Sequence, residues 1–313
     1  MGLFLVKRLL FGAVLVVALS TAAFLLLFGS TATVARNLLG EGATAEQVAA
    51  TQAGLGLDQP LVVQYARWIG AAATGDLGTS WFTSRPVAAL LADRLPVTLS
   101  MLAVTITATA VLSVALGMAA AVRGGRLDRL VQVLSVVGFA LPGFWVAMLL
   151  VQMFALTLGW LPATGYVRLS EDPAGWAASL VLPVTALTIG SVSATAQQVR
   201  GAAVDVLQQD YVRTLRAHGL QEGSVLCRHV LRNAAGPALT VLSLQAVGLL
   251  GGATTIEQVF AIPGIGQLTV DAGLRGDIPV LMGVVTTSVL LVVGVNTAAD
   301  ATAGWLTPKA CAR

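Results

Sequence analysis

Charged side chains are scarce in this sequence. Only 11% of its 313 residues are charged, whereas a soluble domain carries about a quarter. Hydrophobic residues make up 56% of the chain, and its mean hydropathy is +0.84. This composition excludes an ordinary soluble domain and predicts an all-α polytopic protein that lies in a lipid bilayer.

Lysine is almost absent as well, since the chain contains only Lys7 and Lys309. A phosphate-binding loop of the form GxxxxGK followed by Ser or Thr needs a lysine in a glycine-rich setting, and neither lysine has one. The GxSxG and HExxH motifs of hydrolases and zinc proteases are also missing. The chain is therefore not expected to hydrolyse ATP by itself or to have catalytic residues of its own.

Cysteine is the next scarce residue, with Cys227 and Cys311 as the only two thiols. Cys227 and His229 are the nearest approach to a metal-binding pair, but a zinc site needs further ligands that the sequence does not supply. We expect no metal site and no cofactor in this chain.

Long uncharged runs are what the sequence does contain. A transmembrane helix needs roughly 20 apolar residues, and six gaps between successive charged residues reach that length. The third gap is too long for one helix, and its Pro- and Gly-containing tail, Gly159–Tyr166, predicts a loop at the membrane surface. The six gaps are Leu9–Ala35, Leu95–Val122, Leu130–Val167, Pro173–Val199, Asn233–Ile256 and Ile278–Ala299.

These runs divide the chain into three parts. Residues 1–30 are predicted to form the first transmembrane helix, because their apolar run exceeds the length of a signal-peptide core. Residues 31–95 are predicted to be an extracytoplasmic segment, which includes a helix with Thr44 as its N-cap and an amphipathic stretch with Tyr65 and Trp68 at the interface. Residues 96–313 are predicted to be a five-helix core with a cytoplasmic loop at about 200–233.

The distribution of charge gives the orientation. With the N-terminus in the cytoplasm, twelve of the 18 basic residues lie on the inner side. Of the 15 acidic residues, four lie inside and ten outside, and Asp300 lies at the inner end of the last helix. Cytoplasmic loops carry an excess of Lys and Arg. Both termini are therefore predicted to be cytoplasmic, and the basic balance reflects topology rather than binding to nucleic acid.

The interiors of the six runs are polar in places but not charged. Proton- or ion-coupled carriers usually need ionisable residues at membrane depth, so their absence argues against such a carrier. Pro142 predicts a bend in the third helix, and the Gly- and Pro-broken stretch 257–266 predicts a re-entrant or surface-lying turn on the outer side. Candidates for lining a path through the membrane are Thr185, Ser191, Thr195, Gln245 and Thr254.

A polar island, residues 200–233, separates two of the uncharged runs. Its segment 210–218 predicts a short helix, and Gly219 suits the left-handed position that follows a helix. Two interpretations stay open from the residues alone. The island is either a solvated basic loop that enforces topology or a helix that docks into a groove of a partner.

The island is one of several motifs that follow one another in a specific order along nearly the whole chain. These motifs are Gly56–Leu61, Gly75–Gly78, Arg94–Leu99, Leu141–Trp145, Leu158–Tyr166, Asp210–Leu220, Glu257–Gly266, Asn296, Asp300 and Pro308. In this order they resemble the permeases of binding-protein-dependent ATP-binding cassette (ABC) transporters, in the dipeptide, oligopeptide and nickel subfamily, where the polar island corresponds to the EAA loop.

The sequence departs from the general EAA pattern within the island. Arg213-Thr214-Leu215 stands where Glu-Ala-Ala would lie. Of the residues of the general pattern, only the glycine is present at its expected distance, as Gly219. His218 stands where a lysine commonly precedes the glycine in the peptide subfamily, which softens the positive charge offered to a partner at neutral pH, since an unperturbed histidine titrates near pH 6.5.

The resemblance implies a type I ABC importer permease of the bacterial inner membrane, with six transmembrane helices. It implies a second homologous permease, two ATPase subunits that bind ATP and Mg²⁺, and an extracytoplasmic substrate-binding protein as partners, but no nucleic acid. Ala217, His218, Gly219, Leu220 and Glu222 would form the coupling helix that seats in a cleft of an ATPase. The coupling residues would be Arg213, Arg216, Ala217, His218, Gly219, Leu220 and Glu222.

A peptide is the expected substrate. Import of nickel or glutathione by the same family is the alternative, and a self-sufficient channel or secondary carrier is the alternative from another class. The missing charges within the helices argue against the carrier, and the island argues against a simple channel.

Overall fold

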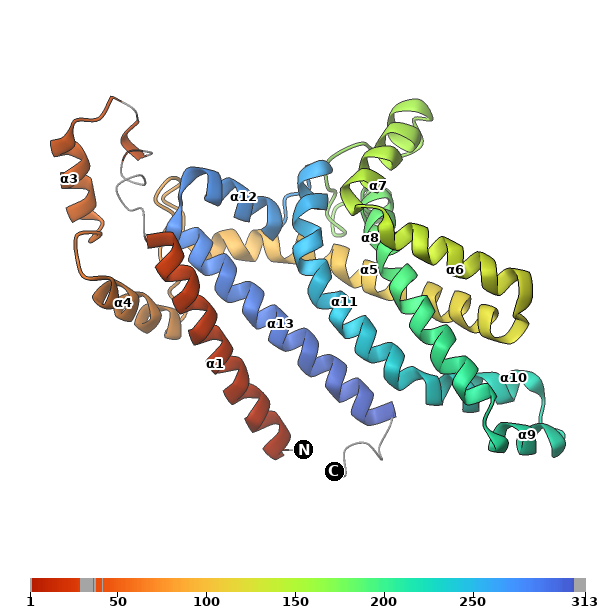
Figure 1. The fold of residues 1–313 in the computed structure, drawn as a ribbon. Helices are drawn as coiled ribbons and strands as arrows, with labels where there is room; N and C mark the ends of the chain where they lie inside the picture. The colour runs from red at the N-terminus through yellow and green to blue at the C-terminus, as the bar shows by residue number, and fades with distance from the viewer. Residues whose placement is uncertain (1, 29–35, 37, 41, 307–313) are drawn as a thin grey trace. The chain divides into compact units, whose positions relative to one another are not determined.

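The computed structural model describes residues 2–28, 36, 38–40 and 42–306 (Figure 1). Across these residues the chain is helical, and extended backbone pairs only at the isolated bridge between Thr79 and Pro86. Within these described residues, five helices are long and apolar enough to cross a membrane, and a sixth span results if one sharply bent pair is counted together. The five are Leu10–Leu27, Val87–Arg123, Pro173–Leu207, Glu222–Val259 and Ile278–Ala298, and the bent pair is Gly125–Ala140 with Gly143–Thr157.

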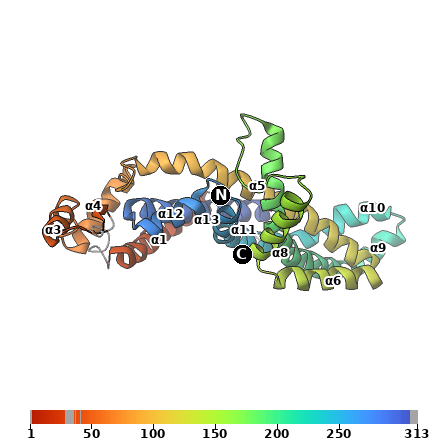
Figure 2. The same ribbon diagram turned by 90° about the horizontal axis from the view of Figure 1, so that it is seen from above.

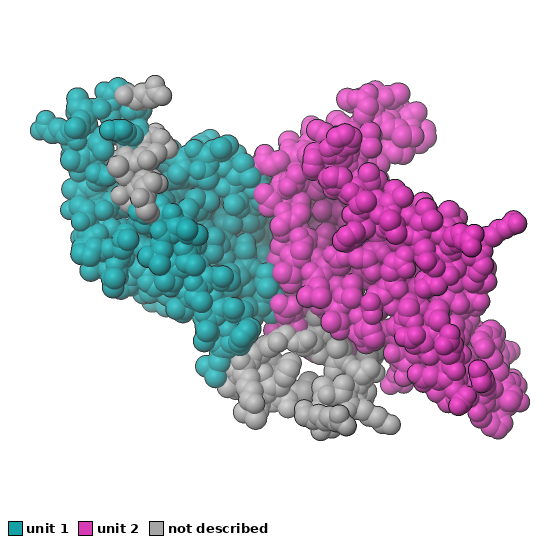
Figure 3. All heavy atoms as spheres, viewed as in Figure 1, with its two compact units in different colours: residues 1–98, 263–294 teal, residues 99–262, 295–313 magenta. Residues whose placement is uncertain are grey.

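The chain divides into two compact units (Figure 3). Unit 1 comprises Met1–Thr98 and Pro263–Gly294, and unit 2 comprises Leu99–Ile262 and Val295–Arg313. Helices α5 (Val87–Arg123) and α13 (Ile278–Leu306) each begin in unit 1 and end in unit 2. Each unit is described separately below.

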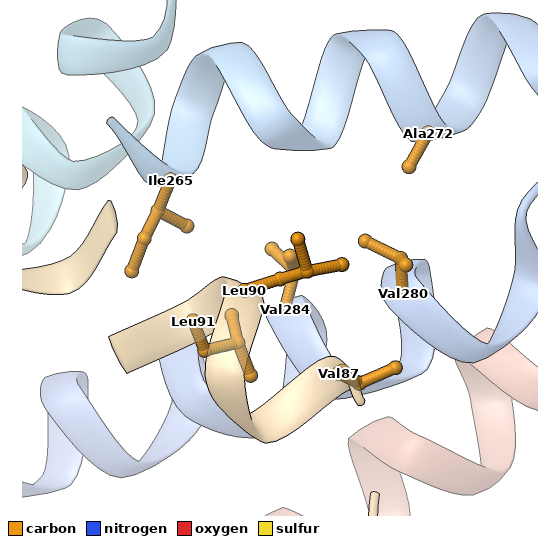
Figure 4. Packing of buried hydrophobic residues seen from close by; sticks show 7 residues of the cluster. All are labelled: Val87, Leu90, Leu91, Ile265, Ala272, Val280 and Val284. Atoms are coloured by element: carbon orange, nitrogen blue, oxygen red, sulfur yellow. The ribbon is translucent and has the colours of Figure 1, made fainter. Parts of the chain in front are cut away.

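The core of unit 1 joins the starts of α5 and α13 with α12 (Ile265–Arg275). Figure 4 shows side chains from all three helices directed toward one another. Gly283 makes this packing possible, because a Cβ there would lie 2.4 Å from Cγ1 of Val87. The buried residues of the cluster are Val87, Leu90, Leu91, Ile265, Ala272, Val280 and Val284.

The outer helices of unit 1 are α3 (Ala45–Gly54) and α4 (Leu61–Ala73). The predicted cap at Thr44 is confirmed: its Oγ1 accepts from the backbone N–H of Gln47 at 3.3 Å, and Gln47 Oε1 accepts from the N–H of Thr44 at 2.9 Å. Tyr65, whose position at the membrane interface stays a prediction, packs on α1 (Gly2–Leu27), with its ring centroid 5.2 Å from that of Phe24. Its Oη lies 2.9 Å from Oγ of Ser20.

A buried carboxylate ties the loop before α5 to the start of α13. Ser80 donates a 2.5 Å hydrogen bond to Oδ2 of Asp277, and the backbone N–H of Trp81 donates to Oδ1 at 3.3 Å. Both Ser80 and Asp277 are buried. Within unit 1 these contacts hold residues 80–81 against the α12–α13 junction.

Unit 2 is built around the long helix α8 (Pro173–Leu207), which packs against α6 (Gly125–Ala140), α7 (Gly143–Leu150) and α11 (Leu231–Val259). The views in Figures 1 and 2 agree that α6 lies along α8 and that α9 and α10 lie together at one end of it. The bend predicted at Pro142 is confirmed. Helix α6 ends at Ala140, α7 starts after Pro142, and the pair is bent by 98°.

The predicted break in the stretch 257–266 is confirmed. Helix α11 ends at Val259 and α12 starts at Ile265, so the Gly- and Pro-containing residues lie between two helices. Phe260 and Ile262 are 2% and 0% exposed, so the turn packs against the protein, and its placement at the outer side of the membrane stays a prediction. The backbone N–H of Gly165 also donates to the Phe260 carbonyl at 2.8 Å, so the loop before α8 covers this turn.

Candidate functional site

The polar island forms a short helical excursion between two long helices. After α8 ends at Leu207, α9 spans Asp210–Ala217, α10 spans Glu222–Ser224 and the π-helical turn η3 spans Val225–Val230 before α11. All eight residues from 216 to 223 are exposed. We call residues 216–223 the tip. Every residue of the expected coupling helix lies in it, whereas Arg213 lies one turn earlier on α9.

The predicted short helix and its glycine are confirmed. Gly219 has φ +77°, its N–H donates to the Arg216 carbonyl at 3.0 Å, and the N–H of Leu220 donates to the Leu215 carbonyl at 3.3 Å. These two bonds are the 5→2 and 6→1 bonds of a Schellman motif, which satisfies the last carbonyls of a helix and needs a left-handed residue after it.

The expectation that Ala217–Glu222 form one coupling helix is wrong. Helix α9 ends at Ala217, His218 caps it, and α10 starts only at Glu222. The physical reason is Gly219 itself, because the left-handed conformation that completes the Schellman motif ends the α9 helix. The tip is a sharp turn between two helical segments rather than a rod.

An ion pair braces this turn. Nη2 of Arg216 lies 2.5 Å from Oε1 of Glu222, and Nε of Arg216 lies 3.1 Å from Oε2. Arg216 donates both hydrogen bonds, so the contact is bidentate. These bonds to the Glu222 carboxylate raise the pKa of Arg216 above its ordinary value. His218 and Leu220 lie between these two residues and stay exposed to solvent.

The inner side of the excursion is an apolar cluster, which we call the root. Val212 on α9 and Val225 and Val230 on η3 are all 0% exposed. They pack with residues at the end of α8 and the beginning of α11. The full set of buried residues is Ala203, Val206, Val212, Val225, Val230 and Ala234. The root therefore connects the tip to both long helices.

Two polar contacts supplement the root. Nδ2 of Asn233 on α11 donates to Oη of Tyr211 on α9 at 2.9 Å and to the His229 carbonyl at 2.8 Å. Further along α8, Arg200 makes a two-pronged ion pair with Asp128 in the first turn of α6, with Nη2–Oδ2 at 2.7 Å. Both side chains are less than one third exposed, so α6 and α8 are tied close to the island.

The five residues predicted to line a path through the membrane do not lie together. Ser191 on α8 and Gln245 on α11 line one cavity of about 380 Å³, together with Phe139, Phe144 and Leu249. Thr185 lines a second cavity of about 390 Å³ between α5, α6 and α8. Thr195 is 2% exposed and its Oγ1 has no partner among the described residues. Thr254 lines neither cavity, so only Ser191 and Gln245 are brought together.

Comparison with family models identifies the architecture. Residues 113–310 match the binding-protein-dependent transport system inner membrane component, and residues 1–102 match the N-terminal part of a binding-protein-dependent transport system membrane component. The chain belongs to this family. It is an ABC importer permease, a multi-pass protein of the bacterial inner membrane.

Individual relatives agree with this assignment. The permease is 38% identical over 264 residues, 84% of each chain, to a putative peptide transport system permease protein of Brucella abortus. It is 38% identical over 267 residues, 85% of each chain, to the glutathione transport system permease protein GsiC of Salmonella paratyphi A. The fold resembles the solved inward-facing MetNI methionine ABC transporter with a TM-score of 0.58 at 20% identity, over 70% of this chain and 96% of that chain.

The sequence did not single out several residues that position the tip of this permease. Tyr211 and Asn233 are 22 residues apart, and Asp128 and Arg200 are 72 residues apart, so no local pattern pairs them. The valines of the root carry a weak signal, because Val212 and Leu215 lie three residues apart on one face of α9. Among the described residues, no group of three or more His, Cys, Asp or Glu could hold a metal ion.

Proposed function

We propose that this permease couples to a separate ATPase through its tip and imports small peptides. The observation that carries the coupling role is the combination of an exposed tip and a fully buried root. The Arg216–Glu222 pair and the Schellman motif fix the shape of the turn. A partner that seats the tip meets a surface that is already organised, which reduces the ordering cost of binding.

A push on the tip has a direct route into the membrane part. The root includes the end of α8 and the start of α11, and these same helices supply Ser191 and Gln245 to the 380 Å³ cavity. Packed side chains shift as units rather than deforming continuously. Movement of the tip by an ATPase would therefore change the spacing of the two helices that line the cavity.

The proposed substrate is a small peptide. The Brucella relative is named for peptide transport and GsiC for glutathione transport, and glutathione is itself a tripeptide. Glutathione is therefore the second candidate within the same chemical class. The polar groups at the cavity include uncharged Ser191 and Gln245, which suit the amide groups that every peptide shares and leave selection among peptides to other subunits.

The proposal includes four further subunits. A second, homologous permease would complete the translocation path through the membrane. Two ATPases, which themselves bind ATP and Mg²⁺, would contact the tips of the two permeases. An extracytoplasmic binding protein would deliver the substrate. This chain would hold no cofactor of its own. Its family description, which names binding-protein-dependent transport, supports this assembly.

Reconstitution tests the whole proposal. The assembled transporter in proteoliposomes should take up radiolabelled di- or tripeptides only with its binding protein and ATP present, and unlabelled glutathione should compete if it shares the path. The permease purified alone should hydrolyse no ATP. Uptake that needs neither ATP nor the binding protein would instead establish a channel or carrier.

A further inference from the structure

An apolar groove lies beside the root, and two of its lining residues, Met118 and Leu226, pack against the root. It has a volume of about 360 Å³ and runs along the last turns of α5. One wall is α5, and the other wall is η3 and the start of α11. The lining residues are Val114, Ala115, Met118, Ala119, Val122, Arg123, Leu226, Cys227 and Leu231.

The two ends of the groove differ in polarity. Its apolar lining continues along α5, away from the island, to the exposed side chain of Val111, which lies on the same helix face three and four residues before Val114 and Ala115. Its other end is Arg123, the last residue of α5, which is exposed and makes no ion pair with any described residue. Hydrocarbon surface thus leads from the membrane-spanning part of α5 to a single guanidinium group at the predicted cytoplasmic end.

The surrounding charge is positive. Three of the four acidic residues on the predicted inner side, Asp128, Asp210 and Glu222, already pair with arginines, and the fourth, Asp205, lines a separate cleft between α8 and α11. Four exposed arginines near the groove in sequence have no ion-pair partner within the described residues. They are Arg126, Arg129, Arg228 and Arg232.

We propose that this groove binds an anionic phospholipid of the inner leaflet, with an acyl chain along α5 and the headgroup phosphate on Arg123. Anionic lipids are attracted to juxtamembrane basic residues, and basic pockets between transmembrane helices on the cytoplasmic side bind their headgroups. Arginine suits a phosphate because its planar donors bind two oxygens together.

A phospholipid fits the groove better than a protein segment does. Arg123 is the only polar side chain in the lining apart from the Cys227 thiol. A docked peptide would leave its backbone N–H and C=O groups without partners against the aliphatic walls, which costs free energy. An acyl chain carries no such groups, and its single charge lies where the groove has its guanidinium. A lipid held there would contact Leu226 and Cys227 of η3, whose neighbours Val225 and Val230 form the root.

Cys227 provides the test, because it lines the groove and is exposed. In a Cys311→Ser background it is the only thiol, and its alkylation by N-ethylmaleimide can be timed in nanodiscs of phosphatidylglycerol or phosphatidylcholine that hold the assembled transporter. We expect phosphatidylglycerol to slow alkylation by about fivefold relative to phosphatidylcholine, the factor that one arginine near an anionic surface contributes. A Cys227→Ser, Gln208→Cys variant reports from an exposed position at the end of α8, outside the groove and the tip, where the two lipids should give equal rates.

Matched arginine variants decide the site. Arg123→Gln should remove the difference between the two lipids at Cys227, whereas Arg126→Gln, with the same change in net charge outside the groove, should keep it. Ala115→Leu, at an exposed position of the lining, should slow alkylation in both lipids alike because the side chain fills the groove. Equal rates at Cys227 in both lipids, or equal effects of Arg123→Gln and Arg126→Gln, would overturn the proposal. So would protection in phosphatidylcholine that depends on the ATPases, since a protein would then cover the groove.

Discussion

Arg216 and Glu222 form an ion pair across the left-handed turn at Gly219, through two hydrogen bonds of 2.5 and 3.1 Å. The two side chains are 42% and 51% exposed, so the pair contributes little to global stability, about 0.2–1 kcal/mol for exposed pairs. Its consequence is local. It links the last turn of α9 to the start of α10, within the tip that we propose an ATPase binds.

Exchanging the charges of Arg216 and Glu222 tests whether the pair stabilises the turn or contacts the ATPase directly. Arg216→Glu and Glu222→Arg should each lower ATP-driven uptake severalfold, because each places two like charges across the turn. The double exchange restores the attraction and should recover most of the uptake, with thermal unfolding changed little throughout. A double variant as inactive as the single ones would mean that these side chains contact the ATPase directly.

Gly219 gives a second test, in which only the backbone is strained. A Cβ at this position would meet no heavy atom within 4 Å, so a larger side chain causes no clash, while φ of +77° disfavours a branched residue. Gly219→Val should abolish ATP-coupled uptake while the complex still assembles, since left-handed backbone costs roughly 1–2 kcal/mol outside glycine.

The matched control is Gly219→Asn, because asparagine adopts the left-handed conformation more readily. It should keep most of the uptake. Co-purification with the ATPase and peptide uptake in proteoliposomes measure the two effects. If Val and Asn behave alike, the conformation of this turn has no role in coupling.

Substitutions in the root should change the free energy of unfolding, whereas substitutions in the tip should change binding of the ATPase. Val212→Ala removes two buried carbons and should lower the free energy of unfolding by about 2 kcal/mol. Leu220→Ala removes a side chain that is 38% exposed on the tip, and surface changes usually stay within about 0.5 kcal/mol.

Leu220→Ala should instead weaken binding of the ATPase, which titration of purified ATPase against the permease in nanodiscs would measure. A Val212→Ala protein with the same free energy of unfolding as the wild type would contradict the role of the root as a well-packed cluster that connects the tip to α8 and α11. Unchanged ATPase affinity in Leu220→Ala would show that the partner binds elsewhere.

Local chemistry explains which features the sequence predicted. Thr44 with Gln47, Pro142, and Gly219 after α9 each depend on neighbours within a few residues, and the structure confirms all three. The order of motifs predicted the family because it spans nearly the whole chain.

Other features depend on contacts between distant residues. Helices α6 and α7, bent by 98° at Pro142, both pack against α8, which no local pattern predicts. The Asp128–Arg200 pair joins residues 72 apart, and the hydrogen bond from Gly165 to the Phe260 carbonyl likewise joins distant parts of the chain. Among the path candidates, only the fold could separate Ser191 and Gln245 from Thr195 and Thr254.

Glycine within the helices of unit 2 gives the last prediction. Gly117 on α5 lies against α8 so closely that a Cβ would be 2.7 Å from Cβ of Val199 and 2.8 Å from the Ala196 carbonyl oxygen. The carbonyl belongs to the backbone of a long helix and cannot rotate away, so Gly117→Ala must push α5 from α8. We expect a loss of about 1–3 kcal/mol, as for other overpacked cores.

Gly201 on α8 is the matched control, because a Cβ there would meet nothing within 4 Å. Gly201→Ala should be neutral or stabilising by up to about 1 kcal/mol, since alanine favours a helix over glycine. Thermal unfolding of both variants in detergent measures the contrast. The same substitution thus has opposite signs on two helices that touch, and the sign depends on whether the position lies at the α5–α8 contact. Equal melting temperatures for the two variants would mean that α5 and α8 are not packed as closely as the structure places them.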